Sequence, residues 1–294
     1  MKVIRKYCRL EAVLVVISAA VIPLVTTGCG DVENSGASRQ TTVTIKPSES
    51  ADDSQDNGVN GDVPTATGFG TLQGRVVFQG TPPTLPPLIK GGAPIKDAEV
   101  CAAVDLPDER LVLGPMNGVQ NVFVYLPKAP RGAPKSEAPQ DSVLFDQKGC
   151  RFFPHALFVR VGQPIQVVSG DPIAHNTHTK QKRSTEFNRV IEASDRNGVL
   201  FNYAKEESAP VPVICDFHTW MRAWHLPLDH PFAAVTQADG SFVISDIPAG
   251  THKFRVWHEG VSGGVLQRNL EVVIKPGEVT PVEVPYPAAK FSAN

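Results

Sequence analysis

The chain has 294 residues, enough for one or two domains with a substantial hydrophobic core. Its 26 prolines and 24 glycines favour many turns and short strands. The formal net charge of −2 at pH 7 lacks the basic excess that a nucleic-acid-binding surface requires, so we expect no nucleic-acid partner.

The first 28 residues have the pattern of a bacterial export signal. Basic residues precede an apolar run over 12–25, which is short for a membrane span and typical of a signal peptide. Residues 25–29 resemble a lipobox that is cleaved before a lipid-modified cysteine, although Thr26 stands where leucine is usual. We therefore expect a lipid on Cys29 that anchors the protein to a membrane of the cell envelope. The alternative is ordinary secretion with a free Cys29.

Residues 29–69 contain no hydrophobic period and are rich in Ser, Thr, Asn, Asp and Gly. Such a segment cannot bury enough apolar surface to offset the entropy of ordering, so it is predicted to be a disordered tether. After it, alternating residues over 70–78 and 119–126 predict strands. Because no long 3.6-residue period follows the signal peptide, the mature protein is predicted to be all-β.

Two of the five cysteines, Cys101 and Cys150, belong to neither the export signal nor the motif described below. In an oxidising compartment such cysteines form persistent disulfides, so this pair is the disulfide candidate. The alternative is two buried free thiols.

The middle of the chain reads as a series of short strands. They are expected over 143–145, 157–161, 165–168, 199–201 and 211–215. In the last of these, Val211, Val213 and Cys215 alternate to one face, which would direct the thiol inward. The run over 179–197 carries many charges of both signs and is interpreted as a solvated excursion between strands.

A thiol, an imidazole and a thioether follow in the next loop. Cys215, His218 and Met221 are spaced C-x2-H-x2-M, so the end of a strand and a tight loop can direct three donors to one point. His175, on a neighbouring strand, would supply the fourth donor. Two histidines, a cysteine and a long axial methionine are the ligands of type-1 copper, because soft sulfur favours Cu(I) and imidazole suits both oxidation states. One type-1 copper per chain is therefore predicted.

This region resembles the cupredoxin family, and its ligand loop resembles that of amicyanin-type members. The upstream order also matches: Phe-x-Pro at 152–154, a strand, a Gly turn, a second strand and then His175-Asn176. The resemblance covers roughly 143–228 and implies a Greek-key β-sandwich. It favours His175 over His178, the alternative fourth ligand, because His175 precedes Asn176. In such proteins this asparagine links the two ligand-bearing loops by hydrogen bonds.

The resemblance also gives expectations for two loop residues. Trp220 would form a hydrophobic rim where electrons leave through His218, with a packing role as the alternative. Thr219 stands where proline often follows the ligand histidine. Its N–H is expected to donate to the Cys215 sulfur and raise the reduction potential.

The C-terminal part resembles the second half of the prealbumin-like module called the carboxypeptidase regulatory-like domain. The string D-G-S-F at 239–242 is followed by I-P-A-G-T and a strand, and its Asp-Gly predicts a hairpin. Strands that match the first half of such a module lie before the cupredoxin-like region. We therefore expect a discontinuous β-sandwich, 70–140 plus 229–294, with the cupredoxin-like domain of 141–228 inserted in it. The alternative is two units in series.

Together these features predict a lipid-anchored electron carrier that serves redox partners in the cell envelope. Some proteins that combine a cupredoxin-like part with a regulatory-like part are labelled methylamine-utilisation-like. An enzyme is not expected, because neither H-x-H nor H-C-H, which a second copper centre would need, occurs in the chain. The remaining histidines are interpreted as structural: His155, His225, His230, His252 and His258. The second hypothesis is a copper-binding or copper-storage module, or a protein- or glycan-binding module, without electron transfer.

Overall fold

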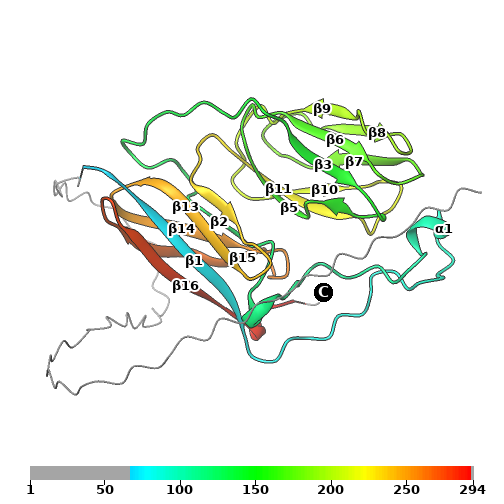
Figure 1. Ribbon diagram of the computed structural model, residues 1–294, viewed down its shortest axis with the longest axis horizontal. Coiled ribbons are helices and arrows are strands. Elements are labelled where there is room, and N and C mark those ends of the chain that lie inside the picture. The colour runs from blue at the N-terminus through cyan, green and yellow to red at the C-terminus, as the bar shows by residue number, and fades with distance from the viewer. Residues whose placement is uncertain (1–66, 293–294) are drawn as a thin grey trace, which may run out of the picture. The chain divides into compact units, whose positions relative to one another are not determined.

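The computed structural model describes residues 67–292, and the prediction of an all-β fold is confirmed (Figure 1). The expected signal peptide, Cys29 and nearly all of the expected tether lie outside the described residues. Within residues 67–292 the helices are single turns: α1 (Ala98–Cys101), η1 (Pro115–Asn117) and η2 (Ala288–Lys290). Within 67–292, no helix has the length and apolar character needed to cross a membrane.

One pair of sheets is built from strands that lie far apart in the sequence; we call it the split sandwich. Its three-stranded sheet has the order β13 (Ser241–Pro248), β1 (Phe69–Gln79), β16 (Val279–Pro287). Its four-stranded sheet has the order β12 (Ala233–Val235), β2 (Phe123–Tyr125), β14 (Gly250–Trp257), β15 (Val265–Ile274). Strands from before and after residues 143–228 therefore share both sheets.

Strand β1 alternates buried and exposed residues and lies between two partner strands. Leu72, Val76 and Phe78 are fully buried on one face, where they pack on Phe254 and Val284 of the split-sandwich core. The strand runs antiparallel to β13 and parallel to β16. It begins at Phe69, one residue inside the expected tether.

Two expectations for the split sandwich are corrected by the strand pairing. The strand expected over 119–126 is confined to β2, because Val119 forms an isolated bridge to Leu113 and donates to the carbonyl oxygen of Val76 without continuing a ladder. The Asp239-Gly240 turn does not close a hairpin: β12 pairs with β2 and β13 pairs with β1, so the turn joins the two sheets. The same local turn chemistry serves a hairpin or a corner between sheets, and the partners of the flanking strands decide between them.

Residues 143–228 form a second pair of sheets, which we call the inserted sandwich. Its four-stranded sheet has the order β4 (Phe152–Phe153), β3 (Val143–Gln147), β6 (Ile165–Ser169), β9 (Val199–Phe201). Its five-stranded sheet has the order β5 (Ala156–Arg160), β11 (Arg222–Leu228), β10 (Val211–Ile214), β7 (His175–Thr179), β8 (Asn188–Ile191). Phe145, Phe152, Ile165 and Val213 are among the fully buried residues of its core.

The charged run over 179–197 is not wholly an excursion. It contains β8, which pairs antiparallel with β7 along the edge of the five-stranded sheet. Its first three residues, Asn188, Arg189 and Val190, are exposed and only Ile191 is buried. An edge strand needs little apolar surface, and charged side chains protect it from pairing with other chains. The charge therefore masked the strand.

The two sandwiches share a third cluster of buried residues. Phe123, Tyr125 and Trp257 of the split sandwich pack there with Leu226 and Leu228 of the inserted sandwich. A polar contact also joins them: Glu259, after β14, accepts hydrogen bonds from His155 and from Nε1 of Trp224, the latter at 2.8 Å. These groups fix the two sandwiches against each other.

Candidate metal centre

The thiol of Cys215 reaches the interior because β10 alternates. Val211 and Val213 are buried, and Cys215, one residue beyond the strand, is 1% exposed on the same side. The loop that follows is closed by the N–H of Met221, which donates to the carbonyl oxygen of His218 at 2.9 Å. His175 opens β7, which pairs directly with β10. Adjacent strands therefore bring all four sequence-predicted residues to one end of the five-stranded sheet.

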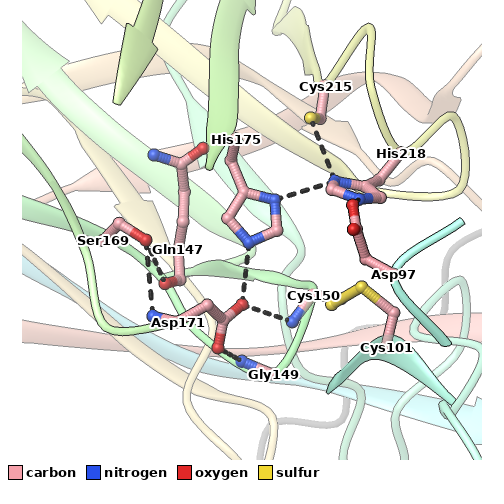
Figure 2. Close-up of a disulfide and its surroundings, with 10 residues drawn as sticks. All are labelled: Asp97, Cys101, Gln147, Gly149, Cys150, Ser169, Asp171, His175, Cys215 and His218. Atoms are coloured by element: carbon pink, nitrogen blue, oxygen red, sulfur yellow. Dashed lines mark hydrogen bonds and ion pairs between the residues drawn. A yellow bond between two sulfur atoms is a disulfide. The ribbon is translucent and has the colours of Figure 1, made fainter. Parts of the chain in front are cut away.

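Three of these residues converge on one point (Figure 2). Nδ1 of His175 lies 2.9 Å from Nδ1 of His218, and Sγ of Cys215 lies 3.7 Å from the same His218 nitrogen. All three side chains are buried. Met221 is 1% exposed and belongs to the same core cluster as Cys215. His178 does not join the group, because its ring contacts Asp216 and Glu186.

Asn176 connects the two ligand-bearing segments. Its backbone N–H donates to Sγ of Cys215 at 3.4 Å, and its side-chain amide bonds Asp216 in both directions, at 2.6 and 2.9 Å. The N–H that reaches the sulfur thus comes from Asn176, whereas the sequence interpretation gave this role to Thr219. Thr219 instead lines a cavity on the outer side of the loop.

Asp171 fixes the orientation of His175, a role that the sequence did not reveal. Its Oδ2 lies 2.8 Å from Nε2 of His175, which leaves Nδ1 facing the centre. The carboxylate is held in turn by the backbone N–H groups of Gly149 and Cys150, at 2.6 and 2.8 Å (Figure 2). A carboxylate behind a ligand histidine selects its tautomer and strengthens it as a donor.

A second carboxylate, Asp97, covers the outer edge of His218. It comes from residues 88–106, a segment whose two ends pair at Ile89 and Leu106 and which we call the cap. Asp97 precedes α1 in the position where aspartate commonly caps a helix, but it makes no cap bond there. Its carboxylate instead lies 2.9 Å from Nε2 of His218, whose side chain is 0% exposed. The His218 ring therefore does not reach the surface, in contrast to the expected exit beside Trp220.

The cap is fastened to the inserted sandwich next to the centre. Cys101, at the end of α1, is disulfide-bonded to Cys150, whose N–H holds Asp171. Ile95 and Val100 of the cap pack against the core that contains Cys215. The cap therefore helps to orient both imidazoles. Asp97 contacts His218 directly, and the disulfide holds the turn whose N–H groups position Asp171 behind His175.

The site lowers the pKa of its thiol. Burial would raise the pKa of Cys215, but hydrogen bonds with His175, His218 and the Asn176 N–H outweigh it and lower the pKa to about 6. Burial likewise would lower the pKa of His175, but hydrogen bonds with Asp171 and Cys215 raise it to about 8. The polypeptide thus stabilises a thiolate, the form of cysteine that binds metal.

This donor set fits type-1 copper. The nitrogens and the sulfur lie within 4.8 Å of one another, so one ion could contact all three. With a metal bound, the histidines would be neutral imidazoles and the cysteine a thiolate, a donor set that suits copper, and Met221 of the same core cluster would be the axial ligand. Both imidazoles are oriented by carboxylates, and the sulfur accepts an N–H, so each ligand has the support that metal ligands require.

The substitution Asp171→Asn is expected to weaken Cu(II) binding about 10- to 100-fold, because the amide no longer fixes His175 as a carboxylate does. Competition titration against a chelator of known affinity measures the change. The control is Asp146→Asn, which removes a carboxylate that pairs with Arg196 elsewhere on the inserted sandwich. Equal copper affinities for the two variants would contradict the role given to Asp171.

A comparison of this structure with solved structures finds partial matches to cupredoxins. The Cu-containing nitrite reductase from Thermus scotoductus SA-01 is 16% identical with a TM-score of 0.26; the match covers 35% of this chain but only 26% of that one. Amicyanin from Paracoccus versutus is 15% identical with a TM-score of 0.25, covering 37% of this chain and 99% of that one. A purple cupredoxin from Nitrosopumilus maritimus is 18% identical with a TM-score of 0.23, covering 29% of this chain and 98% of that one.

No protein-family model matches the sequence, and comparison with curated proteins finds no match.

Proposed function

We propose that the protein is a type-1 copper protein that carries single electrons between redox partner proteins in the cell envelope. The observation that carries this proposal is the buried convergence of His175, His218 and Cys215 with their orienting hydrogen bonds. Bound copper would supply the one-electron redox chemistry. His175, Cys215 and His218 would hold it, with Met221 as the axial ligand.

The chain's own residues support such a role by resisting rearrangement. Asp171 and Asp97 fix the two rings at their Nε2 atoms, and Asn176 ties the ligand loop to β7. A site whose ligands stay in place when the charge changes needs little reorganisation, which favours rapid electron transfer. Burial of all three donors also keeps water out of the centre.

The remaining parts of the proposal concern place and partners. We propose one copper per chain, no enzymatic activity, a lipid on Cys29 and a tether that lets the sandwiches reach partners from an envelope membrane. The split sandwich is proposed to be a prealbumin-like, regulatory-like module, as the string at 239–242 indicates. The combination of a cupredoxin-like and a regulatory-like part suggests a relation to lipoproteins labelled methylamine-utilisation-like.

A second candidate function is copper binding or storage without electron transfer. The covering of His218 by the cap favours it, because a partner cannot approach the imidazole edge directly. Reversible oxidation and reduction separate the two functions. Rapid exchange with a soluble redox protein supports the electron carrier, and a site that binds Cu(I) but never exchanges electrons with proteins supports storage.

The test of the proposal is the optical and EPR spectrum of the purified protein after addition of Cu(II). An intense thiolate-to-Cu(II) band with narrow copper hyperfine splitting is expected, and Cys215→Ser should abolish it. The matched control is His178→Gln, which changes a histidine that lies outside the cluster and should keep the band. A colourless wild-type protein, or a band that survives in Cys215→Ser, would contradict the type-1 assignment.

A further inference from the structure

The four donors of the metal centre are closed off from solvent. His175 and His218 are 0% exposed, and Cys215 and Met221 are 1% exposed. A metal ion that enters or leaves must therefore displace one of the walls around these donors. Most of the walls belong to the inserted sandwich, and the remaining one is the cap, whose Asp97 lies against the outer edge of His218 (Figure 2).

The walls formed by the inserted sandwich are held by several hydrogen bonds each. Strand β7 pairs with β10 on one side and with β8 on the other. The ligand loop is tied to β7 and β8 through Asp216, which accepts hydrogen bonds from the side chains of Asn176 and Asn188 at 2.9 and 3.1 Å. The turn before β4 is tied to Asp171 by two N–H groups. Moving any of these walls would break such bonds.

The cap, by contrast, is a hydrogen-bonded unit of its own. Within the described residues, every backbone–backbone hydrogen bond made by 88–106 joins two residues of the cap. The N–H of Gly92, for example, donates to the carbonyl oxygen of Ala102 at 2.8 Å. The ion pair between Lys90 and Asp105 is internal to the cap as well. The cap can therefore move as one body without breaking a backbone hydrogen bond.

Two neighbouring cap residues hold two neighbouring residues of the ligand loop. The carboxylate of Asp97 lies 2.9 Å from Nε2 of His218. Nζ of Lys96 lies 4.6 Å from the ring centroid of Phe217, which is 37% exposed. We call these two contacts the latch. Both join side chains only, so they can open without any change in the backbone pairing of the inserted sandwich.

The remaining attachments of the cap lie around the end of α1. Cys101 is disulfide-bonded to Cys150, and Ile95 and Val100 are only partly buried where they pack against the core. Parts of a protein with few buried apolar contacts open at the lowest cost in free energy. The disulfide would keep an open cap attached and allow it to return to the same place.

We propose that the cap is a lid over the copper centre. When the latch opens, the cap swings about the Cys101–Cys150 disulfide, and copper enters and leaves through the gap beside His218. This inference rests on the proposed function, because it concerns access to the same centre.

Alkylation of Cys215 in the copper-free, full-length protein measures the opening of the lid. Iodoacetamide is added with the disulfide intact, and mass spectrometry follows the peptide that contains this buried free thiol. Because the thiol reacts only in the open state, the rate reports how often the lid opens. Asp97→Ala should react about tenfold faster, because the closed state loses a hydrogen bond to a charged group. Lys96→Gln should react about threefold faster, because the closed state loses an exposed cation–π contact.

The matched controls change the same kinds of side chain elsewhere on the cap. Glu99→Ala removes an exposed carboxylate of α1, and Lys90→Gln removes the lysine that pairs with Asp105. Both should keep the wild-type rate. Equal rates in the wild type and the two latch variants would overturn the proposal. An increase in Asp97→Ala alone would also overturn it, because that result would report a more reactive thiol rather than an open lid.

Removal of copper by an excess of chelator gives a second measure. The loaded latch variants should lose copper faster than the wild type, by about the same factors as for alkylation. Chelator rates that do not follow the alkylation rates would contradict the role of the lid in copper exchange. A protein without a blue centre would contradict the proposed function and leave the alkylation result standing, whereas unchanged alkylation would leave the copper site standing without a lid.

Discussion

Replacing Cys101 and Cys150 together with alanine is expected to lower the free energy of unfolding by about 4 kcal/mol. The disulfide joins residues 49 positions apart, and a cross-link of that span removes much of the conformational entropy of the unfolded chain. Denaturant unfolding of the oxidised wild type and of the double variant measures the difference. A loss below about 1 kcal/mol would show that the cap is held by packing alone.

The same variant should also loosen the cap. Lys90 and Lys96 are exposed cap residues, so trypsin should cleave there faster once the disulfide is gone, while cleavage at Lys205 should not change. Faster cleavage at both places would point to global unfolding rather than to release of the cap. Release of the cap frees Asp97 from His218. If the protein carries electrons as proposed, this release should accelerate its electron exchange with a soluble redox protein.

Glu259→Gln is expected to destabilise the protein by about 3 kcal/mol at pH 5.5, because it leaves a buried charged histidine without its main partner. His155 and Glu259 form an ion pair in which the two side chains are 8% and 6% exposed. Burial would lower the pKa of His155, but the hydrogen bond and charge of Glu259 raise it. Burial would raise the pKa of Glu259, but the hydrogen bond and charge of His155 lower it.

These directions set the pH window of the effect. The raised pKa of His155 contributes stability that is fully present below its unfolded value of 6.5 and is lost as the pH rises through the folded pKa. The lowered pKa of Glu259 contributes stability that is present above 4.5 and is lost as the pH falls through its folded pKa. The destabilisation by Glu259→Gln should therefore be largest between pH 4.5 and 6.5.

Unfolding in denaturant from pH 4 to pH 9 measures this profile. The matched control is Glu271→Gln, whose partner Lys253 lies 3.9 Å away in a pair exposed to solvent. Such surface pairs contribute little, so the control should stay close to the wild type at every pH. A destabilisation by Glu259→Gln that does not decline at high pH would contradict the raised pKa of His155.

The sequence predicted the centre of the site because its signal is local. Cys215 and His218 lie in one short loop, and β10 alternates strictly enough to show which way the thiol points. Strands β5 and β6 were predicted as two short apolar runs on either side of the turn at Gly162. Strand β11 was not, because it pairs parallel with β5 and is buried almost throughout, so it lacks alternation.

The groups that orient the ligands could not be predicted in this way. Asp97 lies 121 residues from His218 in the sequence, and nothing near it differs from an ordinary helix cap. Asp171 lies only four residues before His175, but its role depends on N–H groups of a turn that the disulfide holds in place. Both contacts arise from tertiary packing, which hydrophobic periodicity does not encode.

The points where the chain leaves and re-enters the split sandwich lie side by side. Tyr125 of β2 faces Ala233 of β12 in the antiparallel register, and the N–H of Leu126 donates to the carbonyl oxygen of Phe232 at 3.0 Å. A tight turn could therefore replace everything from 127 to 231 and leave an ordinary hairpin. In terms of genetic rearrangement, the inserted sandwich occupies the position of a hairpin loop, where an entire domain can be gained, exchanged or lost while the ladder on either side keeps its register.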